Sequence, residues 1–164
     1  MEIDDRLLFL KYALPCASTL VSRGNTTQAY IDKLIRMVSQ GKVPKEKAEK
    51  MFKVANVMCD HWAKKMHKDV IDDSVIRKYF LLEHSQVVDD RYELMKDFNP
   101  VDCKTYPGKV MKVNGSSAMV KTRLGTKRYR TTFAKEVKEG DVVVVHYDFI
   151  IEKAPKRYVN KMNK

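Results

Sequence analysis

Cys103 is the residue whose type and setting most directly suggest chemistry. It opens the sequence Cys-Lys-Thr-Tyr-Pro-Gly-Lys-Val, which places a lone thiol four residues before Pro107-Gly108. A thiolate is a soft ligand for a transition metal such as iron. A single cysteine can equally be an ordinary linker residue, so the spacing alone leaves both interpretations open.

His146 is the second candidate, directly after the apolar run Val142–Val145. A histidine at a strand end can belong to a functional site, or it can be a structural residue with satisfied hydrogen bonds.

Cys59, His61 and His67 are also residue types that bind metals, but Cys59 and His61 point to opposite sides of a helix, which argues against a shared metal. Paired catalytic carboxylates, a nucleophile–base motif and a phosphate-binding glycine loop are not apparent, so we expect neither an enzyme nor a cofactor.

The elements that position these residues change character along the chain. Apolar residues recur every three or four positions through residues 1–98, which predicts four amphipathic helices in a bundle. The first predicted helix runs from about Asp4 to Ser22 with a kink at Pro15, and the second runs from Thr27 to Gly41 with Asn25 or Thr26 as the cap. The third runs from Pro44 to Met66. The fourth runs from a cap at Asp72 or Asp73 to Asn99-Pro100 and has Leu94 and Met95 on its apolar face.

From Tyr106 the sequence has the pattern of strands, with turn signals such as Asn114-Gly115 between them. Five short strands of this kind are typical of a minimal OB-like or SH3-like barrel. The predicted strands are Lys109–Val113, Ala118–Arg123, Arg128–Phe133, Val142–Val145 and Phe149–Ile151. The expected fold class is α+β in two domains: a four-helix domain over 1–99, an OB-like barrel over 100–154, and a basic mobile tail over 155–164 that has little to bury.

Charge is unevenly distributed over the 164 residues. The formal net charge is +11, and residues 101–164 carry 15 Lys and Arg against 6 Asp and Glu, a balance of +9. This asymmetry is typical of a protein that binds nucleic acid, an acidic protein or an anionic surface. Three scattered cysteines, an acidic start and the lack of a long apolar run lead us to expect a cytoplasmic protein without a membrane segment.

The C-terminal motifs together resemble those of a known family. Cys-x-x-Tyr-Pro-Gly-Lys-Val, then Asn-Gly, then Val-x-x-Gly-Asp-Val-Val-Val-Val-His-x-x-Phe-x-Ile-Glu-Lys is similar to the HypC/HupF hydrogenase-maturation chaperones over residues 103–154. The resemblance implies an OB-like barrel and a non-catalytic function. In that family the cysteine follows the initiator methionine, whereas about a hundred residues precede Cys103 here.

The resemblance also implies roles for particular residues. Cys103 would be the partner-binding cysteine and an iron ligand, and His146 would be the family's histidine. Pro107 and Gly108 would set the bend, and Phe149 would be a packing residue at the same end. The implied partner is a protein, either HypD-like or a hydrogenase precursor.

Nucleic-acid binding is the alternative function. One predicted hairpin carries several cations around an aromatic residue, which suits phosphates and base stacking. The residues are Lys121, Arg123, Lys127, Arg128, Tyr129 and Arg130. A solvated charged edge that discourages strand pairing explains the same residues equally well.

Overall fold

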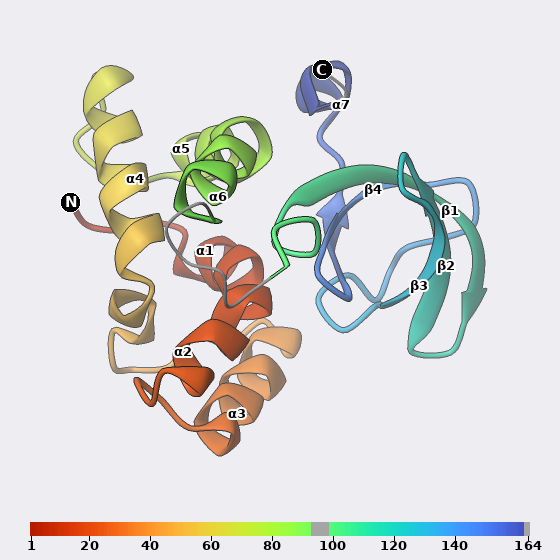
Figure 1. Ribbon diagram of the computed structural model, residues 1–164, viewed down its shortest axis with the longest axis horizontal. Coiled ribbons are helices and arrows are strands. Elements are labelled where there is room, and N and C mark those ends of the chain that lie inside the picture. Colours follow the sequence, from red (N-terminus) through yellow and green to blue (C-terminus); the bar gives the residue numbers. More distant parts are fainter. Residues whose placement is uncertain (93–98, 163–164) are drawn as a thin grey trace. The chain divides into compact units, whose positions relative to one another are not determined.

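The computed structural model describes residues 1–92 and 99–162. It confirms the predicted α+β organisation, with helices in the N-terminal part and a closed five-stranded barrel in the C-terminal part (Figure 1). The chain divides into two compact units, Met1–Glu83 and His84–Lys164. This division falls within the last predicted helix, and the domain limits expected from the sequence stay predictions.

The first unit consists mainly of helices. Its elements are α1 (Arg6–Ala13), α2 (Ser18–Ser22), α3 (Gln28–Ser39), α4 (Lys53–Lys65) and α5 (Asp73–Arg77), with 3-10 turns at Leu14–Ala17 and Ala48–Met51 and a π-helical segment at Lys78–Glu83. Pro15 lies in the first 3-10 turn, which separates α1 from α2 as the predicted kink requires. Aromatic rings form the centre of this unit, where Phe80 stacks on Tyr12 with centroids 5.0 Å apart and meets Phe9 edge-on at 6.0 Å.

Helix starts differ from the sequence prediction at two places. The cap of α3 is Thr27 itself, whose side chain accepts a hydrogen bond from the backbone N–H of Tyr30, and not Asn25 or Thr26. The third helix begins at Lys53 and not at Pro44, since the segment before it forms turns and a 3-10 turn. There Arg6 donates hydrogen bonds to the backbone carbonyls of Pro44 and Glu46, so tertiary contacts hold these groups outside a helix.

Asp72 caps α5, as one of the two predicted alternatives. Its carboxylate accepts hydrogen bonds from the backbone N–H groups of Ser74 and Val75. The predicted apolar residues Leu94 and Met95 lie outside the described residues. Among the residues described, no helix combines the length and apolar character needed to cross a bilayer.

The second unit is the barrel with a helix at each end of its sequence. Its elements are α6 (His84–Tyr92), β1 (Thr105–Asn114), β2 (Ser117–Thr122), β3 (Gly125–Arg130), β4 (Val142–His146), β5 (Phe149–Lys153) and α7 (Lys156–Met162). The strands close in the order β1-β2-β3-β5-β4, and β4 pairs with β1. Alternate side chains of the strands point inward and form a core that includes Val120, Val143 and Ile150.

Two details of this unit differ from the expectation. β3 begins at Gly125 and ends at Arg130, so it lies earlier than the predicted Arg128–Phe133 because the preceding turn is tight. The tail expected to bury little forms α7 beside β1, and its Tyr158 is buried. The aromatic ring of Tyr158 indicated that this basic segment could pack, but the prediction rested on the charge of the segment.

Candidate functional site

The pairing of β1 with β4 brings the two candidate residues of the sequence together. Thr105 pairs with His146 and Tyr106 with Val145, so the segment just before β1 meets the end of β4. There the Nε2 atom of His146 lies 2.9 Å from the backbone carbonyl oxygen of Cys103. Cys103 and His146 are 43 residues apart in sequence, and both are buried.

This hydrogen bond fixes the tautomer of His146. A carbonyl oxygen only accepts, so Nε2 must carry the hydrogen and donate it. In the neutral ring the lone pair is then on Nδ1. An imidazole oriented by a backbone carbonyl in this way is typical of histidines that bind metals.

The segment before β1 is tied to the barrel at further points. The backbone N–H of Tyr147 donates to the carbonyl of Asp102 at 3.2 Å. The hydroxyl of Tyr106 donates to the carbonyl of Val101 at 2.9 Å. Cys103 therefore lies on backbone held from both sides, which limits how far its thiol can move.

His84 joins this pair, although the sequence analysis did not single it out. It is the first residue of α6 and is buried, and its ring meets that of His146 edge-on with centroids 5.2 Å apart. Burial, and to a lesser extent the neighbouring His146, holds the pKa of His84 well below its ordinary value, so this imidazole is neutral at pH 7. One ring nitrogen of each histidine and the Sγ of Cys103 lie within 4.8 Å of one another.

An ion pair holds α6 against the cysteine segment. Lys104 Nζ lies 2.7 Å from a carboxylate oxygen of Asp89, which is on α6. Since Lys104 follows Cys103 directly, this contact places the helix that carries His84 beside the thiol. No local sequence signal identifies His84, because a histidine in an amphipathic helix has no characteristic spacing to a motif 19 residues later.

Pro107 and Gly108 lie within β1, where the resemblance expected a bend. A Cβ atom at Gly108 would come within 2.5 Å of Val120 Cγ1 and 2.9 Å of Thr122 Cγ2 on β2. Gly108 is therefore needed for the close approach of the two strands. The turn-forming role of Pro107-Gly108 becomes a packing role in the barrel wall.

Phe149 is a buried residue of the barrel unit. Its ring stacks on Phe133 with centroids 4.9 Å apart, and the guanidinium of Arg130 lies 4.5 Å from its centroid. Phe149 starts β5 opposite His146. It supports the turn between β4 and β5, which directly follows His146.

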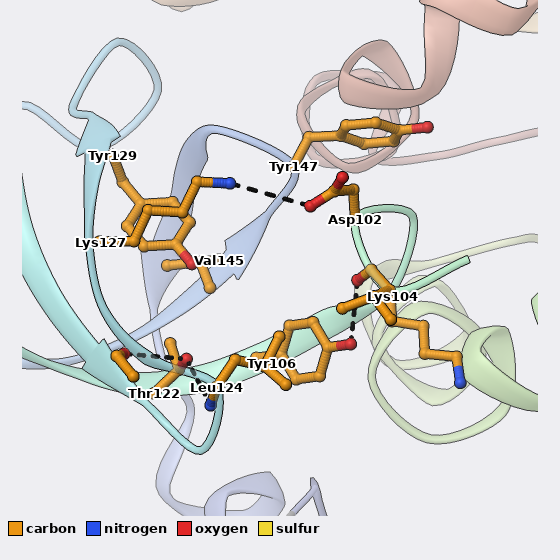
Figure 2. A pocket seen from close by; sticks show the side chains of 11 residues that line it. Asp102, Lys104, Tyr106, Thr122, Leu124, Lys127, Tyr129, Val145 and Tyr147 are labelled. Atoms are coloured by element: carbon orange, nitrogen blue, oxygen red, sulfur yellow. Dashed lines mark hydrogen bonds and ion pairs between the residues drawn. The ribbon is translucent and has the colours of Figure 1, made fainter. Parts of the chain in front are cut away.

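A pocket of about 200 Å³ opens at this end of the barrel (Figure 2). Its lining includes Asp102 and Tyr147, the neighbours of Cys103 and His146 in sequence. Lys127 Nζ lies 3.8 Å from a carboxylate oxygen of Asp102 at its rim. Tyr147 adopts a positive φ of 52°, a conformation that a residue of this size rarely takes outside functional or tightly held turns.

The strand register divides the cations of the predicted nucleic-acid surface between two faces. Lys121, Arg128 and Arg130 are exposed and share the outward face of β2 and β3. Lys127 is on the alternate face, at the pocket, and Arg123 follows β2 with its guanidinium 5.2 Å from the Tyr106 ring centroid.

Tyr129 does not offer the exposed ring that base stacking would use. Only 4% of its surface is exposed, and it belongs to the barrel core. Burial raises the pKa of its hydroxyl. Strand alternation accounts for this, since Tyr129 is paired with the buried Ala118 and points inward with it.

The other candidate ligands lie in the first unit. Cys59 is fully buried in α4, whereas His61 is exposed. Burial raises the pKa of the Cys59 thiol to about 12. His67 follows the helix in a left-handed conformation, with φ of 53°.

Comparison with known families bears on the barrel. Residues 103–164 match the model of the HupF/HypC family. The matched segment begins at Cys103 and contains His146, whereas His84 and the helices of the first unit precede it. No curated protein matches the chain. The C-terminal barrel is thus similar to the HupF/HypC family. That family consists of chaperones and not of enzymes, and its members act with protein partners.

The donors at the site suit a transition metal. A thiolate and imidazole nitrogens are ligands of iron and of neighbouring transition metals. Cys103 supplies the sulphur, and His146 supplies an imidazole with a fixed tautomer. The cysteine lies inside the chain here, so the thiol and the backbone carbonyl of Cys103 are present but not the free amine of a terminal residue.

Proposed function

We propose that this chain is a non-catalytic module of the hydrogenase-maturation type, which captures a protein partner through the Cys103 end of its barrel. The observation that carries the proposal is the pairing of β1 with β4. It brings together two residues of the family's sequence pattern, Cys103 and His146, which share one hydrogen bond of 2.9 Å. The match of residues 103–164 to the HupF/HypC family supports the same conclusion.

The partner would be a HypD-like protein or a hydrogenase precursor. Iron carried between them would be a substrate held by the Cys103 thiolate, with His146 beside it. The pocket next to Cys103 offers a recess of about 200 Å³ with mixed aromatic and charged walls, suited to a protruding side chain of the partner. Ion pairs at its rim, such as Lys127 with Asp102, would contribute more to specificity than to affinity.

Affinity measurements with purified proteins test this proposal. The wild-type chain is titrated against a HypD-type protein and a [NiFe]-hydrogenase precursor from the same host, and Cys103→Ala is compared with it. We expect Cys103→Ala to weaken binding by at least about tenfold, which corresponds to about 1.4 kcal/mol. Cys59→Ala, which also removes a buried thiol, is the matched control and should bind like the wild type. Equal affinity of Cys103→Ala and the wild type would overturn the proposal.

Salt dependence separates the proposal from nucleic-acid binding. Partner binding at the Cys103 end should change little with added salt, whereas binding to single-stranded RNA or DNA falls steeply because bound counterions are released. Tight, salt-sensitive binding of an oligonucleotide that is lost when Arg128 and Arg130 are both replaced by alanine would favour the alternative. The burial of Tyr129 is the observation against it.

A further inference from the structure

His84, Cys103 and His146 form a cluster whose chemistry is that of a metal site. They supply two imidazoles and one thiol, and the three donor atoms lie within 4.8 Å of one another. All three residues are buried and belong to the second unit.

The arrangement of the two rings fits one ion. With metal–nitrogen distances of about 2.0–2.1 Å and tetrahedral angles, two imidazoles bound to the same ion have ring centroids about 5 Å apart. The centroids of His84 and His146 are 5.2 Å apart, and their planes are 77° from parallel. Donor atoms around such an ion are about 3.5 Å from one another, so the cluster would need only a small contraction to bind.

The surroundings orient the donors as a metal site requires. His146 donates from Nε2 to the carbonyl of Cys103, the kind of outer hydrogen bond that fixes the tautomer of a ligating histidine. Lys104 and Asp89 join the cysteine segment to α6 and so keep His84 next to Cys103. Each donor is therefore on backbone that other contacts hold in place.

We propose that His84 completes, with Cys103 and His146, a binding site for a divalent late first-row transition metal. One thiolate and two imidazoles suit Zn²⁺ and Co²⁺, which accept tetrahedral sites of mixed sulphur and nitrogen donors. His84 precedes the residues that match the HupF/HypC family, so this three-donor set is a property of this chain.

Cobalt titration of the full chain tests this inference. The metal-free protein is titrated with Co²⁺, and we expect one equivalent to give thiolate-to-cobalt charge transfer together with the intense visible bands of a tetrahedral ion. One equivalent of Zn²⁺ should abolish these bands, as expected from the order of metal affinities. A protein that shows no charge-transfer band at stoichiometric Co²⁺ would overturn the inference.

Substitutions assign the donors. Cys103→Ser should abolish the charge-transfer band, and His84→Ala should weaken Co²⁺ binding by more than about 100-fold, beyond the 10–100-fold typical of an outer-shell residue. His61→Gln, an exposed histidine of α4, is the matched control and should bind like the wild type. Persistence of the band in Cys103→Ser, or unchanged affinity in His84→Ala, would overturn the assignment.

X-ray absorption on the wild-type zinc form covers the case in which a variant fails to fold. A sulphur shell together with scattering from two imidazoles would support the site, and a shell of oxygen atoms alone would exclude it. These measurements use the chain without a partner, so they are independent of the proposed function. A wild-type chain that binds the metal but captures no partner would contradict only the proposed function. A wild-type chain that captures a partner but binds no metal would contradict only the metal site.

Discussion

Cys59 in the helical unit and Cys103 in the barrel unit are both buried, but their surroundings differ. Cys59 is fully buried in the apolar face of α4, and burial raises the pKa of its thiol to about 12, so it stays protonated at pH 7. Cys103 is buried with two imidazoles and next to a pocket. The comparison teaches that the polar groups buried with a thiol, more than burial itself, decide whether it can act as a ligand.

The same contrast extends to the rest of the two units. In the helical unit large aromatic side chains pack together, since Phe80 stacks on Tyr12 and meets Phe9 edge-on. In the barrel unit the core combines valine, alanine and isoleucine side chains with two tyrosines, and polar groups lie around Cys103. The helical unit therefore shows chiefly side-chain packing, whereas the barrel unit combines packing with a cluster of side chains that can bind a metal.

Thiol reactivity gives the largest expected difference. With a pKa of about 12, Cys59 holds about a thousandth of the thiolate of an ordinary cysteine at pH 8, so iodoacetamide should modify it about 1000-fold more slowly than a model thiol. Zn²⁺ should slow the modification of Cys103 in proportion to metal occupancy and leave Cys59 unchanged. Peptide mass spectrometry over time measures both, and urea-unfolded protein is the control. Equal rates at Cys59 and the model thiol in the folded protein would break the comparison.

Phe80→Ala tests the packing role of the helical unit. Removal of a ring that contacts Phe9 and Tyr12 should lower the free energy of unfolding by about 3–5 kcal/mol. Urea denaturation followed by circular dichroism measures the change. Val57→Ala, at an exposed position of α4, is the control and should stay within about 0.5 kcal/mol of the wild type. A loss below 1 kcal/mol for Phe80→Ala would show that the aromatic cluster is not a main source of stability.

Gly108→Ala tests whether the motif glycine acts through packing in the barrel. The new Cβ would lie 2.5 Å from Val120 Cγ1, so we expect a loss of about 1–3 kcal/mol from overpacking. Combining it with Val120→Ala removes the closest clashing methyl group, and a double-mutant cycle should therefore show favourable coupling between the two changes. Additive losses in the cycle would show that contact with Val120 is not the cause.

Asp72→Ala has the smallest expected effect. Burial alone would raise the pKa of Asp72, but hydrogen bonds from Lys68, Ser74 and Val75 lower it to about 2. Because this is below the ordinary 3.8, the stabilisation is complete above about pH 4 and is lost as pH falls toward 2. We expect a loss of about 1 kcal/mol at pH 7, measured by urea denaturation. Asp72→Asn should keep most of the cap at pH 7 without this pH dependence, and a wild-type loss centred above pH 5 would contradict the assignment.

The barrel was predictable because its signals are local. Turn residues such as Gly115, which takes a positive φ, and the run Val142–Val145 locate strands without knowledge of what they pair with. Helix starts were less predictable. Pro44 carries a start signal, but the hydrogen bonds from Arg6, 38 residues earlier in the chain, hold its neighbourhood in turns.

The candidate site could be predicted in part. Cys103 and His146 were identified from the residues around them, but their contact depends on the pairing of β1 with β4. His84 could not be found, because its relation to them arises only when α6 lies beside the cysteine segment. Tyr129 shows the reverse case, since a ring among cations suggested stacking while strand alternation turned it inward.

The way the barrel closes determines where it opens transiently. β3 meets β5 in parallel through the pair Arg130 and Phe149, and the backbone N–H of Arg130 donates to the carbonyl of Asp148 at 2.7 Å. The antiparallel pairs elsewhere in the barrel are longer, so transient opening of the ring should begin at this seam. Opening there would release one flank of the β4–β5 turn, which directly follows His146, while β1 and β4 stay paired. The site would thus gain brief access to solvent without unfolding of the barrel wall that supports it.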